Sequence, residues 1–177
     1  MRNWKRALDR LHPLLLAWIW VALLILQLVL VFFVFQEPGI RALTLCGWVI
    51  WGLGAVFGLL PIVTLRAKGR VAEGKSYMAT TTLVDTGIYA IVRHPQSGTA
   101  GILLSLALAF IGQHWLLVVL AAVGVAAIYV DTFRADETCI EKFGQAYVHY
   151  MHRVPRVNFV SGLLRLLVHS RSEGAET

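Results

Sequence analysis

The sequence predicts an all-α, polytopic membrane protein with about four transmembrane helices. Of its 177 residues, 58% are hydrophobic and only 15% are charged, and the mean hydropathy is +0.68. That balance leaves too few charges to cover a soluble surface. A spanning helix needs roughly 20 mainly apolar residues, and the chain contains several uncharged runs long enough to supply one. We therefore expect a single membrane domain over residues 1–177.

The apolar runs divide into two single spans and a hairpin. Residues 13–36 and 42–65 are each long enough to cross the bilayer once. The first run is too long for the core of a signal peptide and is not followed by a small-residue cleavage site, so we expect it to remain in the mature protein. Residues 100–130 are too long for one ordinary span, and the polar residues 112–114 divide them. We predict a helical hairpin with arms over 100–112 and 114–131.

The second span carries four glycines, at positions 47, 52, 54 and 58. Small residues let membrane helices approach closely. The pattern is compatible with packing inside the chain and with a dimer interface, and the sequence does not indicate one oligomeric state.

The polar parts of the chain are few. Residues 66–99 form a loop too long for a simple connector, and loops of that length are usually functional. We predict a helix over residues 132–156 that leaves the membrane. Phe143, Tyr147, Tyr150 and Met151 would share one of its faces. Pro155 is expected to end it.

Lysine and arginine gather on one side of the predicted spans, which sets the orientation. These residues precede the first span, occupy the 66–99 loop and follow the hairpin, whereas the opposite loops carry a single arginine. We expect an integral protein of a cytoplasmic or inner membrane, with both termini and the 66–99 loop in the cytoplasm. The net charge of +6 is explained by this asymmetry and by contact with anionic lipids, so no nucleic-acid partner is expected.

The hairpin brings two polar segments to the same membrane face. Arg93 and His94 precede its first arm, while Asp136 and Glu137 follow its second, so the two pairs should be neighbours in space. Sequence patterns for a dinucleotide site and for a P-loop are absent. His149 and the histidine three residues later lack further clustered ligands, so no metal site is expected.

Three segments together point to a known family. They are LVDTGIYAIVRHP (83–95), an acidic pair after the hairpin, and KFGQAYVHYMHRVPR (142–156). This ordered set resembles the superfamily of isoprenylcysteine carboxyl methyltransferases and phospholipid methyltransferases, integral-membrane enzymes that use S-adenosylmethionine. The resemblance covers roughly residues 80–156. It implies cofactor contacts at Leu83, Val84, Gly87, Tyr89, His94, Pro95, Gln96, Ser97, Asp136 and Glu137.

The residue types suit that cofactor. His94 and the free N–H groups near the start of the hairpin can bind its carboxylate, and the acidic pair can accept from its ammonium or ribose groups. Leu83, Val84 and Tyr89 can form apolar walls, Gly87 permits an unusual turn, and Pro95 suits the first turn of a helix.

The predicted catalytic residues lie beside these positions. Arg93 or Arg134 could orient an anionic acceptor, a lipid or lipophilic small molecule such as a prenylcysteine carboxylate. Glu137 could take the proton of an amine acceptor. Arg153 and Arg156 are interpreted as membrane anchors rather than ligands.

The chain departs from the family pattern in ways that bear on the acceptor. Ser97 stands where an aromatic residue is frequent, Asp131 where an arginine is frequent, with Arg134 as the nearest substitute. Two alternatives remain open: a phospholipid amine N-methyltransferase, and a non-enzymatic membrane transporter or scaffold. A transporter is expected to place polar residues at mid-membrane, where Gln27 is the main exception to an apolar pattern.

Overall fold

The computed structural model describes residues 15–35 and 39–173, and over those ranges the protein is helical with no β-strand. Four of its helices are long and apolar enough to cross a membrane, which confirms the predicted fold class. The elements are α2 (Leu15–Val29), the π-helical turn η1 (Leu30–Val34), α3 (Arg41–Lys68), α4 (Ile88–Ile91), the π-helical turn η2 (Pro95–Ala100), α5 (Gly101–Gly112), α6 (Trp115–Phe143), α7 (Gln145–Arg153) and α8 (Phe159–Glu173).

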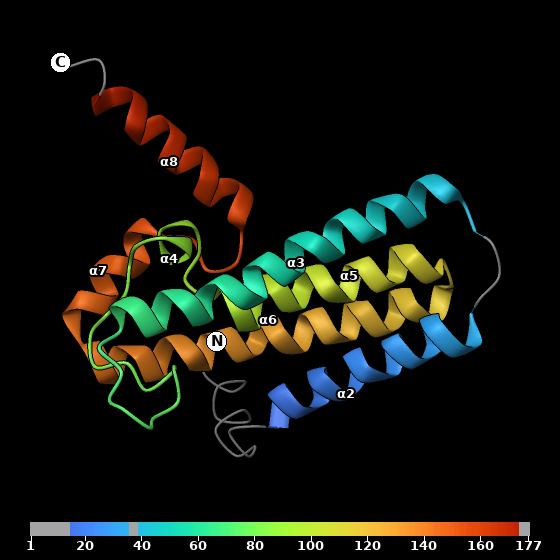
Figure 1. Ribbon diagram of the computed structural model, residues 1–177, viewed down its shortest axis with the longest axis horizontal. Coiled ribbons are helices and arrows are strands. Elements are labelled where there is room, and N and C mark those ends of the chain that lie inside the picture. The colour runs from blue at the N-terminus through green and yellow to red at the C-terminus, as the bar shows by residue number, and fades with distance from the viewer. Residues whose placement is uncertain (1–14, 36–38, 174–177) are drawn as a thin grey trace, which may run out of the picture.

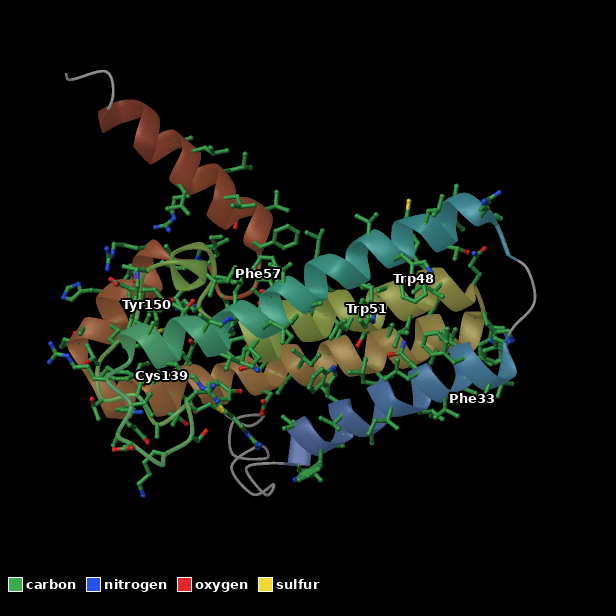
Figure 2. The ribbon with its side chains drawn as sticks, in the orientation of Figure 1. Phe33, Trp48, Trp51, Phe57, Cys139 and Tyr150 are labelled. Carbon is green, nitrogen blue, oxygen red and sulfur yellow. The ribbon has the colours of Figure 1, made fainter. Side chains whose placement is uncertain are left out.

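The four apolar helices lie side by side in an elongated bundle (Figure 1). α5 packs against α3 on one side and α6 on the other, and α2 packs against α6. We call the end that carries α4, α7 and the 69–87 segment the loop end, and the end that carries the connection between α5 and α6 the turn end. In Figure 2, Cys139 and Tyr150 lie toward the loop end and Trp48 toward the turn end.

Two of the glycines of the second span, Gly47 and Gly54, serve packing within the chain. Gly47 and Gly54 are buried in α3 against α5. A Cβ atom on Gly47 would lie 2.7 Å from the Ile111 side chain and 3.0 Å from the Ala107 carbonyl oxygen, so only a glycine allows this approach. Gly52, in contrast, faces open space.

The predicted hairpin is confirmed as α5 and α6. The polar side chains of Gln113 and His114 stabilise the turn between them. Gln113 adopts a left-handed conformation, with φ 45°, and ends α5. Its side-chain amide accepts a hydrogen bond from Ile40 N (2.8 Å) and donates to the Ile40 carbonyl (3.1 Å) and to Thr44 Oγ1 (3.0 Å). His114 Nδ1 accepts from Leu116 N and caps α6.

Two polar side chains, Gln27 of α2 and Ser105 of α5, are buried in the middle of the bundle. Gln27 of α2 has no exposed surface, and its Nε2 donates to the Ser105 carbonyl (3.3 Å) and the Leu117 carbonyl (3.1 Å). Gln27 therefore attaches α2 to the α5–α6 hairpin, because hydrogen bonds between helices have few competitors in a bilayer.

The residues of the predicted helix over 132–156 are mostly helical, but the structure divides them between two elements. α6 continues without a break to Phe143, because no glycine or proline lies between its membrane part and that residue. Gly144, with φ 58°, then changes the chain direction and begins α7. α7 ends at Arg153, before Val154 and Pro155, as expected for an extended residue preceding proline.

The other expected boundaries shift outward. α3 extends to Lys68, and the first arm of the hairpin begins at Pro95 rather than at residue 100, with Pro95 in its first turn as predicted. The 66–99 loop therefore contains the end of α3, the short helix α4 and the start of η2. Residues 13, 14 and 36 of the first predicted span lie outside the described residues.

Candidate functional site

Two of the sequence motifs are joined by their backbones at the loop end. Arg93 N donates to the Pro155 carbonyl and His94 N donates to the Arg156 carbonyl, both at 3.0 Å. The segment after α7 therefore runs alongside the segment that enters η2. In the same segment after α7, the Val157 carbonyl accepts from Thr99 Oγ1 at 2.9 Å. These bonds hold residues 93–99 and 155–157 as one unit.

Asp136 lies at the centre of this unit. Its carboxylate is 3% exposed, and its Oδ1 accepts from His94 Nε2 and from the Tyr147 hydroxyl, each at 2.7 Å. Its Oδ2 accepts from Arg156 Nε at 2.9 Å and Nη2 at 2.8 Å. Since a carboxylate offers about four acceptor sites, Asp136 is saturated by groups of its own chain. We call these four side chains (His94, Asp136, Tyr147 and Arg156) the Asp136 network.

The predicted convergence of the two polar segments is confirmed for three of the four residues named. His94 bonds to Asp136, and Arg93 Nη2 lies 3.5 Å from Asp136 Oδ2. Glu137 lies on the next position of α6 and is exposed. The acidic pair is therefore split between a buried structural carboxylate and an exposed one.

Arg93 is the network neighbour with unused hydrogen-bonding capacity. Its side chain is 7% exposed, and its Nε is buried with no hydrogen-bond partner among the described residues. A buried guanidinium donor without an acceptor is unfavourable, so this atom favours an external anion or carbonyl.

Arg156 was interpreted as a membrane anchor, and the structure corrects that interpretation. Besides binding Asp136, its guanidinium lies 3.6 Å from the centroid of the Phe133 ring and 5.9 Å from that of Tyr129. Arg153, in contrast, forms an exposed pair with Asp85 at 3.2 Å. The positive-inside rule describes both arginines equally well, so charge alone could not distinguish them.

Tyrosines of α7 form the apolar side of the site. Tyr147 and Tyr150 are buried, with ring centroids 5.6 Å apart, and the Tyr150 hydroxyl donates to the Tyr89 carbonyl at 2.7 Å. Burial, and then the hydrogen bond to Asp136, raises the pKa of the Tyr147 hydroxyl above its ordinary value. Burial likewise raises the pKa of Tyr150 and of Tyr89. In the sequence, the three-residue spacing of Tyr147 and Tyr150 indicated that both lie on one face of a helix.

The remaining predicted cofactor residues lie in the segment before α4 and in η2. Leu83 packs on the α7 tyrosines, and Val84 is buried. Gly87, with φ 64°, begins α4. Pro95 is buried at the start of η2, and Ser97 is exposed.

Gln96 brings the 69–87 segment to the site. Its Oε1 accepts from the Tyr77 hydroxyl at 2.9 Å, a contact that no sequence pattern indicated. Arg134 is half-buried on α6, and the half-buried Asp131 interacts electrostatically with Arg134 and His94.

α8 packs against the back of the site. Gly162 lies so close to Ile91 that a Cβ atom at this position would clash with the Ile91 carbonyl oxygen. The Arg165 Nη2 donates to the Ala90 carbonyl at 2.6 Å, and Phe159 contacts Phe57 of α3 with ring centroids 5.3 Å apart. α8 therefore contacts the backbone of α4 directly before Arg93.

The described residues contain no group of three or more side chains arranged to hold a metal ion. No family model, no curated protein and no solved structure matches this chain.

Proposed function

We propose that this protein is an integral-membrane methyltransferase that transfers a methyl group from S-adenosylmethionine to a lipophilic acceptor. The observation that carries the proposal is the meeting of three motif segments at Asp136: RHP through His94, the acidic segment, and YxxYxxRVPR through Tyr147 and Arg156. If these segments were membrane anchors, nothing would require them to bind one another. A shared site gives a reason for their order and spacing.

The residues present fit the proposed cofactor. The unpartnered Nε of Arg93 can donate to the carboxylate of S-adenosylmethionine. Glu137, exposed beside Asp136, can accept from its ammonium or ribose hydroxyls. Leu83 and the Tyr89 ring supply apolar contact for an adenine ring. The Asp136 network holds His94 and the residues around it in place.

Methyl transfer requires the protein mainly to position the two reactants. When bound, S-adenosylmethionine supplies an activated methyl group on a sulfonium. An acceptor lone pair would take this methyl group as the S–CH₃ bond broke, with S-adenosylhomocysteine as the leaving group. A carboxylate acceptor yields a neutral methyl ester and loses no proton. An amine acceptor loses one proton, which Glu137 can accept. The chain's role is to align the reactants and to exclude water.

The fold suggests where a lipophilic acceptor would approach. Arg93 and the Asp136 network lie at the loop end, beside the ends of helices long enough to span a bilayer. A lipid-like acceptor can therefore keep its chain in the bilayer while its polar group reaches this end. Arg93, with Arg134 as the alternative, is the cation proposed to orient an anionic acceptor.

Binding of S-adenosylmethionine to the detergent-purified protein, measured by calorimetry, tests the cofactor assignment. We expect Arg93→Gln to weaken binding at least tenfold. Arg153→Gln is the matched control, because Arg153 is 63% exposed and pairs with Asp85 rather than with Asp136, and it should stay within twofold of the wild type. A wild-type protein that binds neither S-adenosylmethionine nor S-adenosylhomocysteine would overturn the proposal.

The labelled product distinguishes the acceptor classes. Membranes containing the protein are incubated with methyl-labelled S-adenosylmethionine, and the labelled lipids are then treated with alkali. A methyl ester releases volatile labelled methanol, whereas an N-methylated phospholipid retains its label on the amine. Retained label would favour the phospholipid amine N-methyltransferase and assign Glu137 the role of base.

No separate observation favours a transporter. Gln27, a buried polar residue in the middle of the bundle, donates through its amide nitrogen to backbone carbonyls of the hairpin and so joins α2 to it. A flux through proteoliposomes that depends on Arg93, without cofactor binding, would favour a transporter instead.

A further inference from the structure

A groove of about 660 Å³ lies on the half of the bundle remote from the Asp136 network. Its walls are one face of α5, carrying Leu106 and Phe110, and one face of α6, carrying Val118 and Val125. Ile40 and Leu43, around the start of α3, close its end. Volumes of this size hold small-molecule ligands in other proteins.

The hollow arises from small side chains on the facing helices. Ala109 of α5 and Ala121 and Ala122 of α6 line it where larger residues would fill the space. Leu106 and Val118 are 38% and 57% exposed, so the groove opens sideways from the bundle. Since α5 and α6 belong to the spanning hairpin, the medium at that opening is lipid.

The groove is polar at one end only. Gln113 and His114 of the turn lie there, and both are fixed: Gln113 by its bonds to Ile40 and Thr44, His114 by its stacking on Phe35 with ring centroids 3.9 Å apart. A site that is apolar along its length and polar at its outer end matches an amphiphile with one chain in the groove.

The length of the groove agrees with one leaflet. The lining of α6 runs from Trp115 to Val125, a rise of about 15 Å along the helix, and half of the hydrocarbon core is also about 15 Å. Asp136 lies eleven residues beyond Val125, about 17 Å further along α6. A ligand in the groove is therefore separate from the proposed methyl-transfer site.

We propose that this groove binds one acyl chain of a bilayer phospholipid in the leaflet at the turn end, with the headgroup beside Gln113 and His114. The bound chain covers the alanine floor and completes the packing between α5 and α6. The inference does not depend on the proposed catalytic function, because none of the groove residues belongs to the Asp136 network.

A photoreactive lipid tests the inference in the intact protein. The protein is reconstituted in phosphatidylcholine vesicles that contain a trace of phosphatidylcholine with a diazirine near the end of one acyl chain. After illumination, adducts are mapped by mass spectrometry of peptides. We expect labelling to concentrate on the segments 106–110 and 118–125, well above the level at the lipid-exposed Val49 and Val63 of α3.

Filling the groove should remove this labelling. Ala122→Phe places a ring over the alanine floor and should reduce groove adducts at least fivefold. Val123→Phe is the matched control, since Val123 is 51% exposed on the same helix but does not line the groove, and it should leave the adducts unchanged. Val118→Phe is a second filler at an exposed wall position, should Ala122→Phe fail to fold by thermal melting.

Two results would overturn the inference. Adducts spread evenly over α2, α3 and α6, or unaffected by both fillers, would mean that the groove is only bathed by bulk lipid. Chain-to-chain adducts at the groove, with a doubled mass in detergent, would mean that a second copy of the protein covers it.

Discussion

Asp136 is a buried carboxylate, and its environment decides whether it stabilises or destabilises the fold. Removing a carboxylate from water costs several kcal/mol, which only well-placed partners can offset. Here the two oxygens accept hydrogen bonds from His94, from Tyr147 and from two nitrogens of Arg156, all at 2.9 Å or less. The partners are His94, directly before η2, Tyr147 in α7 and Arg156 in the segment after α7, so this one residue joins the α6–α7 region to a segment 42 residues earlier in the sequence.

The Asp136→Asn variant should be strongly destabilised. An asparagine side chain would place an N–H₂ group against donors that now face a carboxylate oxygen. It would also leave the partly buried Arg156 without its counter-ion. We expect a loss of about 3–5 kcal/mol in the free energy of unfolding, measured by denaturant titration in detergent. Asp85→Asn breaks the exposed pair with Arg153 and should cost less than about 1 kcal/mol. Equal losses in the two variants would contradict a structural role for Asp136.

The buried tyrosines predict sensitivity to alkaline pH. Burial holds the pKa of Tyr89, Tyr147 and Tyr150 above the ordinary value in the folded protein, whereas in the unfolded chain it is about 10. Below that pH their contribution to stability is fully present. Above it the unfolded chain releases protons that the folded state keeps, so stability falls by about 1.4 kcal/mol per pH unit for each tyrosine.

Unfolding measured from pH 8 to 11 checks this prediction. The wild type should be steady to about pH 10 and then lose stability, while Tyr147→Phe should show a slope smaller by about one tyrosine's share. An unchanged slope in that variant would exclude Tyr147 from the alkaline transition.

At the scale of elements, α8 is the helix whose position depends most on a single residue. It diverges from the bundle in Figure 1, and it contacts α4 through Gly162 and Arg165. Val160, Leu163, Leu164, Leu167 and Val168 are exposed along it with the spacing of an amphipathic helix. One face of α8 therefore supports the candidate site while its exposed stripe suits the membrane interface.

Gly162→Ala should displace α8 from α4. An alanine gains about 1 kcal/mol of helix propensity over glycine, but its Cβ would clash with the Ile91 carbonyl oxygen. Relief of such a clash typically costs about 1–3 kcal/mol. We expect faster proteolysis of α8 and weaker S-adenosylmethionine binding, since Ile91 directly precedes the site. Gly52→Ala, where a Cβ meets nothing within 4 Å, should change neither. Unaltered proteolysis in Gly162→Ala would show that α8 is not held at this contact.

The elements also show what sequence reasoning could reach. Long apolar runs and the polar break at Gln113 were sufficient for the spans and the hairpin, because bilayer thickness fixes helix length. The continuation of α6 to Phe143 was missed because the change from apolar to polar residues was taken as a helix end, although it marks only a change of surroundings. The hairpin topology was sufficient to predict that His94 lies near Asp136. That Arg156 also binds Asp136 could not be predicted, because it depends on where the chain runs after α7.

At the scale of the whole molecule, the two ends of the bundle differ in chemistry. The loop end carries the Asp136 network and most of the described basic residues, whereas the turn end carries Gln113, His114 and the single Arg41. A protein that uses a water-soluble cofactor needs its site open to the compartment that holds the cofactor. The asymmetry of Lys and Arg predicts that this compartment is the cytoplasm.

Cysteine accessibility tests this orientation in the full chain. In a background with Cys46→Ala and Cys139→Ala, one reporter is placed at each end: Met78→Cys at the loop end and Trp115→Cys at the turn end, positions that are 66% and 70% exposed. A membrane-impermeant maleimide should label Trp115→Cys in intact cells, and Met78→Cys only after the membrane is permeabilised. The charge asymmetry gives the reason, because short loops rich in Lys and Arg remain cytoplasmic. The reverse pattern would place the Asp136 network outside the cytoplasm and would contradict the proposed use of S-adenosylmethionine there, while leaving the lipid groove to be assigned to the other leaflet.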